Sequence, residues 1–172
     1  VGMLLALAMA QKGASVRVLE REDHIIDSPR AAVYFPSTLL ILDELGILPE
    51  LEEIGFRNRN FGTHIPEFDY HSVVVTEPIE GIKYDYQLHA GQDDVARVAM
   101  EHAQKLGVEV LFGHEVHGYE EYDDRILVMT TGPGGEKTYE ARWLVGCDGA
   151  RSTVRKLAEI EFEGHTWPER FV

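Results

Sequence analysis

Asp148 and Gly149, followed by Arg151 and Arg155, form the stretch of this sequence whose residue types most clearly suggest ligand chemistry. Glycine lets the backbone approach a ligand closely, free N–H groups and arginines can meet phosphate, and a carboxylate can accept a hydrogen bond from a hydroxyl. The spacing is typical of an anion-binding turn at the start of a helix. It is equally typical of a capped helix whose arginines are solvated.

Glu20 is the second candidate because it ends a predicted strand. Residues 2–12 are apolar and are closed by Gly13, which predicts a buried helix, and residues 15–20 then predict a short strand. A carboxylate at such a strand end can accept hydrogen bonds from a ribose diol. The alternative is that Glu20 is one acid among several in residues 20–23, and the residues alone leave both interpretations open.

The helix and the strand together predict the second half of a parallel βαβ unit. Such a unit needs a strand before residue 2, so we expect that the chain has lost one at its N-terminus. Residues 1–10 also resemble a secretory signal, but no basic segment precedes them and they lead directly into the strand. A buried helix is therefore favoured, and the run is too short to span a bilayer.

The remaining pattern alternates helices with short strands. Pro36 begins a helix that runs through Glu44, and residues 92–106 give the clearest amphipathic pattern. Further helical segments are expected at residues 49–54 and 150–157. Short strands are expected at residues 71–75, 84–88, 108–112, 114–122, 125–131 and 138–148, with residues 132–135 as a turn. Within the last of these strands, residues 143–147 are apolar enough for a central position.

Composition excludes several classes of partner. The 30 acidic and 16 basic residues give a formal net charge of -14 and a pI near 4.9, which disfavours nucleic acid and anionic membranes. Cys147 is the only cysteine, so no internal disulfide can form and a cytoplasmic location is expected. His114 and His117 lie three residues apart on a predicted strand and so face opposite sides; no metal site is expected.

Taken together, the stretches resemble the flavoprotein aromatic hydroxylases related to para-hydroxybenzoate hydroxylase. The resemblance is carried by residues 1–6 and 18–21, by residues 29–31 with 42–47, and by residues 144–155. Their order and spacing match that family over essentially the whole chain. The resemblance implies an α/β fold, namely a Rossmann-like FAD-binding domain with a parallel βαβ core and added antiparallel strands, incomplete at both ends.

The resemblance also implies roles for single residues towards FAD. Gly2 would close the phosphate-binding turn, and Glu20, with Arg21 beside it, would hold the adenosine ribose. Arg30 would reach the ribose or the pyrophosphate. Gln92 would contact the phosphate and ribityl part of the flavin.

Further implied contacts lie in the second half of the chain. The backbone near Val116 would approach adenine. Asp148 and Gly149 would support the FAD pyrophosphate and the transient binding of NAD(P)H, with Arg151 beside them. Residues 1–157 would then form a partial FAD/NAD(P)-binding domain, and residues 158–172 would begin a substrate domain.

The implied activity is that of a monooxygenase in which NAD(P)H is the reductant, O₂ the oxidant and a small phenolic compound the substrate. No residue of this chain is a candidate for the catalytic step, and the family's Gly-Asp contact to FAD has no counterpart in it. Two alternatives stay open. The parent protein could be another FAD-dependent oxidoreductase, such as a quinone-pathway hydroxylase, a halogenase or an isoprenoid reductase, or the chain could be an inert nucleotide-binding fragment. Assembly into a homo-oligomer also stays open.

Overall fold

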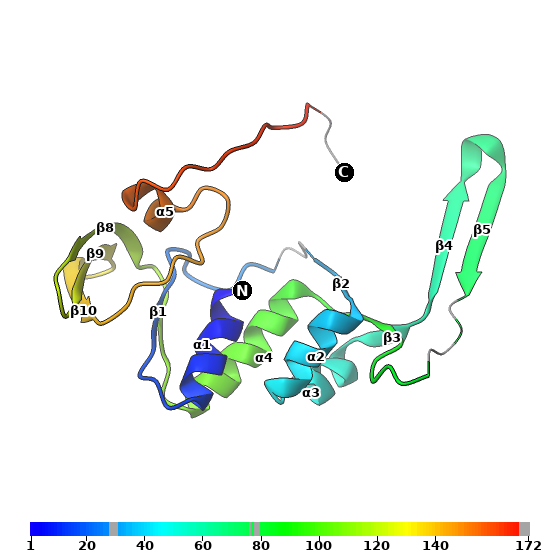
Figure 1. Cartoon of the computed structure of the whole chain (residues 1–172), viewed down its shortest axis with the longest axis horizontal. Coiled ribbons are helices and arrows are strands. Elements are labelled where there is room, and N and C mark those ends of the chain that lie inside the picture. Colours follow the sequence, from blue (N-terminus) through cyan, green and yellow to red (C-terminus); the bar gives the residue numbers. More distant parts are fainter. Residues whose placement is uncertain (28–30, 76, 78–79, 169–172) are drawn as a thin grey trace. The chain divides into compact units, whose positions relative to one another are not determined.

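The computed structural model describes residues 1–27, 31–75, 77 and 80–168 (Figure 1). The chain divides into two compact units, each with its own packing. Unit 1 consists of Val1–Gly2, Leu19–Asp23 and Leu111–Val172, and unit 2 consists of Met3–Val18 and His24–Val110.

Four helices build the core of unit 2. They are α1 (Gly2–Gln11), α2 (Pro36–Glu44), α3 (Leu48–Ile54) and α4 (Gln92–Lys105). Each contributes side chains to one apolar cluster, in which Leu7, Leu39, Leu51 and Val98 are completely buried. Burial of such side chains is the main source of stability, so this cluster holds the unit together.

The helix ends follow the sequence signals closely. Pro36 stands in the first turn of α2, where its missing N–H costs nothing, and the prediction of a helix from Pro36 to Glu44 is confirmed. Gly13 and Gly107 adopt the left-handed conformation, with φ of +84° and +87°, just beyond α1 and α4. Glycine tolerates this conformation without strain, which explains why both helices stop there.

A small antiparallel sheet accompanies these helices. Its strands are β2 (Val33–Tyr34), β6 (Gln87–His89) and β3 (Phe56–Asn58), in the order β2-β6-β3. A strand at residues 84–88 was expected, but β6 starts later and includes His89. Gly55 allows the close pairing, because a Cβ atom there would lie 2.3 Å from the carbonyl oxygen of His89.

The strands β4 (Asn60–Ile65) and β5 (Tyr70–Val75) form a separate hairpin (Figure 1). They are joined by a 3₁₀ turn at Pro66–Phe68 and by Asp69, which adopts a left-handed conformation with φ of 48°. All six residues of β4 are exposed. The hairpin is therefore held by its backbone pairing and not by a buried face.

The strands β1 (Arg17–Leu19) and β7 (Glu109–Leu111) pair with each other. The N–H of Glu109 donates to the carbonyl of Val16, and further along the N–H of Glu20 donates to the carbonyl of Leu111. The residue numbers of the bonded partners increase together along both strands. The two strands are therefore parallel, as expected of a βαβ unit.

Unit 1 is built on a three-stranded antiparallel sheet of β8 (Glu115–Glu121), β9 (Ile126–Gly132) and β10 (Gly135–Ala141). Gly132 pairs with Gly135 across a two-residue turn, so the turn predicted at residues 132–135 is confirmed. The short helix α5 (Thr153–Leu157) packs against β8.

The strand expected at residues 138–148 is present only in its first part, since β10 ends at Ala141 and residues 143–147 continue as an irregular segment. Trp143 and Val145 are 78% and 62% exposed. A strand needs a hydrogen-bonded neighbour, and none of the described strands is paired with this segment. Apolar composition alone was therefore not enough to form a strand here.

Candidate functional site

Asp148 organises the loop that leads into α5. One of its carboxylate oxygens, Oδ2, accepts hydrogen bonds from the N–H of Thr153 at 2.5 Å and the N–H of Val154 at 3.2 Å. The other, Oδ1, accepts from the hydroxyl of Ser152. The Ser152 oxygen in turn accepts from the N–H of Arg155 at 3.0 Å. These N–H groups are those that a helix leaves without partners in its first turn, so Asp148 and Ser152 together cap α5.

This arrangement corrects one expectation about the loop. Free N–H groups at the start of α5 were expected to meet phosphate, but those of Thr153, Val154 and Arg155 already donate to side chains of the chain itself. The helix cap of the alternative interpretation is therefore observed, and the binding of an anion by Gly149 and Arg151 stays a prediction. Ser152 was missed as a site residue, although a serine directly before a helix is a recognisable capping signal.

The same contacts determine the direction in which the pKa of the Asp148 carboxyl is shifted. Burial is the largest single influence and raises the pKa of this carboxyl, because it disfavours the charged form. The hydrogen bonds from the Ser152 hydroxyl and from the N–H groups of Val154 and Thr153 stabilise the carboxylate and together outweigh burial. The pKa of Asp148 is therefore lowered, and the side chain is an anion at neutral pH.

Glycines allow close backbone contacts around this loop. A Cβ atom on Gly146 would lie 2.9 Å from the Cβ of Val154, and one on Gly2 would lie 3.1 Å from the Cβ of Cys147. Gly149 adopts a left-handed conformation with φ of +77°. The first residues of the chain thus lie beside Cys147, directly before the Asp148 loop.

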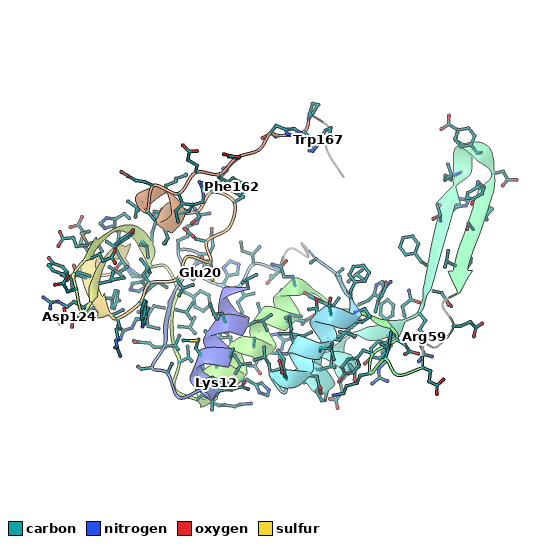
Figure 2. All side chains as sticks on the ribbon, in the orientation of Figure 1. Lys12, Glu20, Arg59, Asp124, Phe162 and Trp167 are labelled. Atoms are coloured by element: carbon teal, nitrogen blue, oxygen red, sulfur yellow. The ribbon has the colours of Figure 1, made fainter. Side chains whose placement is uncertain are left out.

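Glu20 lies at the end of β1 and is half-buried (Figure 2). Its N–H donates to the carbonyl of Leu111 at 2.9 Å, and its carbonyl accepts from the N–H of His114 at 2.8 Å. Its carboxylate oxygen Oε1 accepts from the N–H of Glu22 at 3.0 Å. The backbone is thus fixed and the carboxylate is held in a local turn, while the exposed side chain of Arg21 pairs with Glu22 at 3.1 Å.

Val116 lies on an edge strand. β8 pairs only with β9 in its sheet, and the pairing shifts by a bulge between Val116 and Gly118. An edge strand has unpaired backbone groups on one side, which a ligand can bind. His114, which anchors the backbone of Glu20, directly precedes this strand, and α5 with its Asp148 cap packs against it.

Unit 1 therefore brings most of the expected site residues together. They are Gly2, Glu20, Arg21, Val116, Asp148, Gly149 and Arg151. Gln92 belongs to unit 2, where it is exposed at the start of α4. Arg30 lies outside the described residues.

Two acids follow Gln92 in the first turn of α4, namely Asp93 and Asp94. Carboxylates stabilise this end of a helix because its partial charge is positive. Asp94 also pairs with Arg97 at 2.5 Å. The acids reduce the attraction of this helix end for phosphate, so Gln92 is better placed to bind neutral hydroxyl groups than an anion.

No group of three or more His, Cys, Asp and Glu side chains in the described part of the chain is arranged to hold a metal ion. Likewise, none of the helices formed by the described residues has the length and the apolar character that a membrane crossing requires.

Comparison with known proteins gives a family match and several relatives of this chain. A family model described as "FAD binding domain" matches residues 1–171. The para-nitrophenol 4-monooxygenase of Pseudomonas sp. (strain WBC-3) is 37% identical over 100% of this chain and 43% of its own length. The 6-hydroxy-3-succinoylpyridine 3-monooxygenase HspB of Pseudomonas putida (strain DSM 28022 / S16) is 36% identical over 100% of this chain and 44% of its own.

A solved structure shares the fold. The crystal structure of the p-nitrophenol 4-monooxygenase PnpA from Pseudomonas putida DLL-E4 matches 96% of this chain with a TM-score of 0.88 and 33% identity, over 42% of the PnpA chain. The chain thus spans less than half the length of the relatives it matches.

Proposed function

The chain belongs to the FAD binding domain family, and from that premise we propose that it is the flavin-holding part of an NAD(P)H-dependent monooxygenase that hydroxylates a phenolic compound. The α/β fold, the family and FAD as the cofactor, all expected from the sequence, are confirmed by the family match and the likeness to PnpA. That likeness is the observation that carries the proposal. Hydroxylation would be an activity of the whole protein, because the matched relatives are much longer than this chain.

The residues of unit 1 fit the adenosine half of FAD. Glu20 has a fixed backbone and a half-buried carboxylate, which suits the acceptance of hydrogen bonds from a ribose diol. The edge of β8 at Val116 offers unpaired backbone groups to adenine. Gly149, in its left-handed conformation with nothing within 4 Å of its Cβ position, would let the backbone approach the pyrophosphate, and Gly2 would present the start of α1 to it.

Asp148 would act through the loop that it shapes. Because its oxygens are bound to Ser152, Thr153 and Val154, its first task is to fix the position of Gly149 and of the exposed Arg151. Arg151 would then supply the positive charge that meets the FAD pyrophosphate or the transiently bound NAD(P)H. Arg30 would add a second cation to the same cofactor.

Gln92 would bind the ribityl hydroxyl groups of the flavin rather than its phosphate, given the acids that follow it. Nearby in the sequence, the buried atom Nε2 of His89 has no hydrogen-bond partner among the described residues. A buried polar atom without a partner is costly, so a ligand group or a water molecule at this position would stabilise the domain. When bound, FAD would supply the redox chemistry that takes electrons from NAD(P)H and activates O₂.

The proposal also covers the domain boundary, the kinds of partner and the cellular location. Residues 1–157 would belong to the cofactor-binding domain and residues 158–172 would begin the substrate domain. The net charge of -14 argues against nucleic acid as a partner, and the single Cys147 together with the use of NAD(P)H supports a cytoplasmic location.

The test of the reaction uses the full-length protein with FAD, NADH or NADPH, and a panel of phenols that includes para-nitrophenol. We expect consumption of the reductant to be matched by a product that carries one oxygen atom from isotopically labelled O₂, detected by mass spectrometry. Oxidation of NAD(P)H without any oxygenated product would contradict the proposal and favour another FAD-dependent reaction.

The test of the site compares Glu20→Gln with Glu22→Gln in the full-length protein. Glu20→Gln keeps the size of the side chain but weakens a charge-assisted hydrogen bond to the ribose, so the flavin content after purification should fall and the dissociation constant of FAD should rise about tenfold. Glu22 pairs with Arg21 and serves as the matched control. Equal flavin content in both variants would remove Glu20 from the site.

A further inference from the structure

His64 and His71 form a pair of imidazole rings that the cofactor site does not use. They stand directly opposite each other on β4 and β5. Their Nδ1 atoms lie 2.8 Å apart, and the ring centroids are 4.1 Å apart with an interplanar angle of 32°. Two ring nitrogens thus point at one another across the hairpin.

The separation of these nitrogens matches that of neighbouring ligands on a metal ion. Imidazole nitrogens bind first-row metals at about 2.0 Å. At that bond length two ligands at a right angle lie about 2.9 Å apart, and two ligands of a tetrahedron lie about 3.3 Å apart. The observed 2.8 Å therefore fits two adjacent positions of a square-planar or octahedral site.

The proton arrangement also suits metal binding. Without a metal, one Nδ1 donates a proton and the other accepts it, because a neutral imidazole has one donor and one acceptor nitrogen. Oδ1 of Asp69 lies 3.7 Å from Nε2 of His71. This distance is too long for a hydrogen bond, so the carboxylate contributes only its negative charge, which favours a cation beside the rings.

The surroundings leave room for further ligands. The side chain of His71 is 64% exposed, and Gly62 occupies the position two residues before His64 on the same face of the hairpin. A Cβ atom on Gly62 would meet only the carbonyl oxygen of Ser72, at 3.9 Å. Water molecules can therefore complete the coordination of an ion held by the two rings.

We propose that His64 and His71 form a two-histidine chelate for a late first-row divalent cation, with the carboxylate of Asp69 adding negative charge nearby. Because the separation fits tetragonal geometry and affinity for nitrogen ligands is highest for copper, Cu²⁺ is the ion that the site should bind most tightly, followed by Ni²⁺. The proposal is independent of the cofactor site and of the proposed reaction.

The test titrates the 172-residue chain with Cu²⁺ alone in a buffer that does not bind metals, followed by calorimetry and electron paramagnetic resonance. We expect one high-affinity equivalent whose spectrum shows two bound nitrogens. His64→Gln and His71→Gln should each weaken binding about tenfold or more, because each removes the gain from holding two ligands in one molecule, and the double variant, which has neither ring, should bind more weakly than either single variant.

His117→Gln is the matched control, since it removes an imidazole from an exposed strand position outside the hairpin, and it should leave the affinity unchanged. Asp69→Asn should weaken binding only severalfold at most, because it removes an exposed neighbouring charge and no ligand. Circular dichroism of each variant checks that the fold is intact. Unchanged affinity in a folded double variant, or a spectrum with a single bound nitrogen, would overturn the proposal.

Discussion

Asp148 carries a charge that the folded chain stabilises through the Ser152 hydroxyl and two backbone N–H groups. A carboxyl with a lowered pKa contributes stability that is fully present above its ordinary pKa and is lost as the pH falls through the lowered value. The relevant pH range therefore begins near 4, the ordinary pKa of aspartate, and extends below it.

This leads to a prediction about acid sensitivity. The chain should be more stable than its Asp148→Asn variant at neutral pH, and the difference in the free energy of unfolding should shrink as the pH falls below about 4. Urea unfolding of both proteins over a series of pH values measures this difference. A difference that stays constant down to acid pH would mean that the charge of Asp148 is not what stabilises the loop.

Gly146 gives a second prediction at the residue scale. Its backbone lies so close to Val154 that an added methyl group would fall 2.9 Å from the Cβ of that residue. Gly146→Ala should therefore push α5 away and lower the free energy of unfolding by about 1–3 kcal/mol. Gly134→Ala is the control, because a Cβ atom there would meet nothing within 4 Å. Denaturant unfolding that affects both variants alike would contradict this explanation.

At the scale of elements, α2 places two neighbouring leucines in opposite environments. Leu39 is completely buried in the core of unit 2, whereas Leu40 is 50% exposed. Leu39→Ala should lower the free energy of unfolding by about 2–5 kcal/mol through lost burial and a cavity. Leu40→Ala should change it by less than about 0.5 kcal/mol. Similar losses in the two variants, measured by thermal or urea unfolding, would show that α2 is rotated from the described orientation.

The elements that could be predicted from the sequence are those whose ends carry a local chemical signal. Pro36 fixed the start of α2, and Gly107 follows the end of α4, because proline and glycine act on the backbone within one turn. The apolar run at residues 143–147 carried no such signal. Whether it becomes a strand depends on a neighbouring strand, which a local pattern cannot supply.

The same distinction between local signals and contacts set by the fold applies to the candidate site. Glu20 and Asp148 could be named as candidates because strand ends and Asp-Gly pairs have recognisable sequence patterns, and their contact with FAD stays a prediction. The direction of the Asp148 carboxylate could not, since it depends on a loop that folds back onto Ser152 and the first turn of α5. The His64–His71 pair was also missed, because the register that sets the two rings opposite each other comes from the length of the connecting turn.

At the scale of the whole molecule, the 30 acidic residues outnumber the 16 basic ones, and the resulting net negative charge affects the association of copies of the chain. Far from the pI, mutual repulsion opposes association through exposed apolar side chains such as Phe68 and Val73. Solubility should therefore pass through a minimum near pH 4.9, where the net charge vanishes. Turbidity measured across a pH series checks this, and a minimum well away from that value would show that local patches dominate association.

The exposed segment around Trp143 has a practical consequence for spectroscopy. The chain has two tryptophans, Trp143 and Trp167, and both are exposed and belong to unit 1; Trp167 is labelled in Figure 2. Tryptophan fluorescence therefore reports on unit 1 alone. The far-ultraviolet circular dichroism of the long helices α1 to α4 reports almost entirely on unit 2. Recording both signals along one denaturation curve separates the melting of the two units.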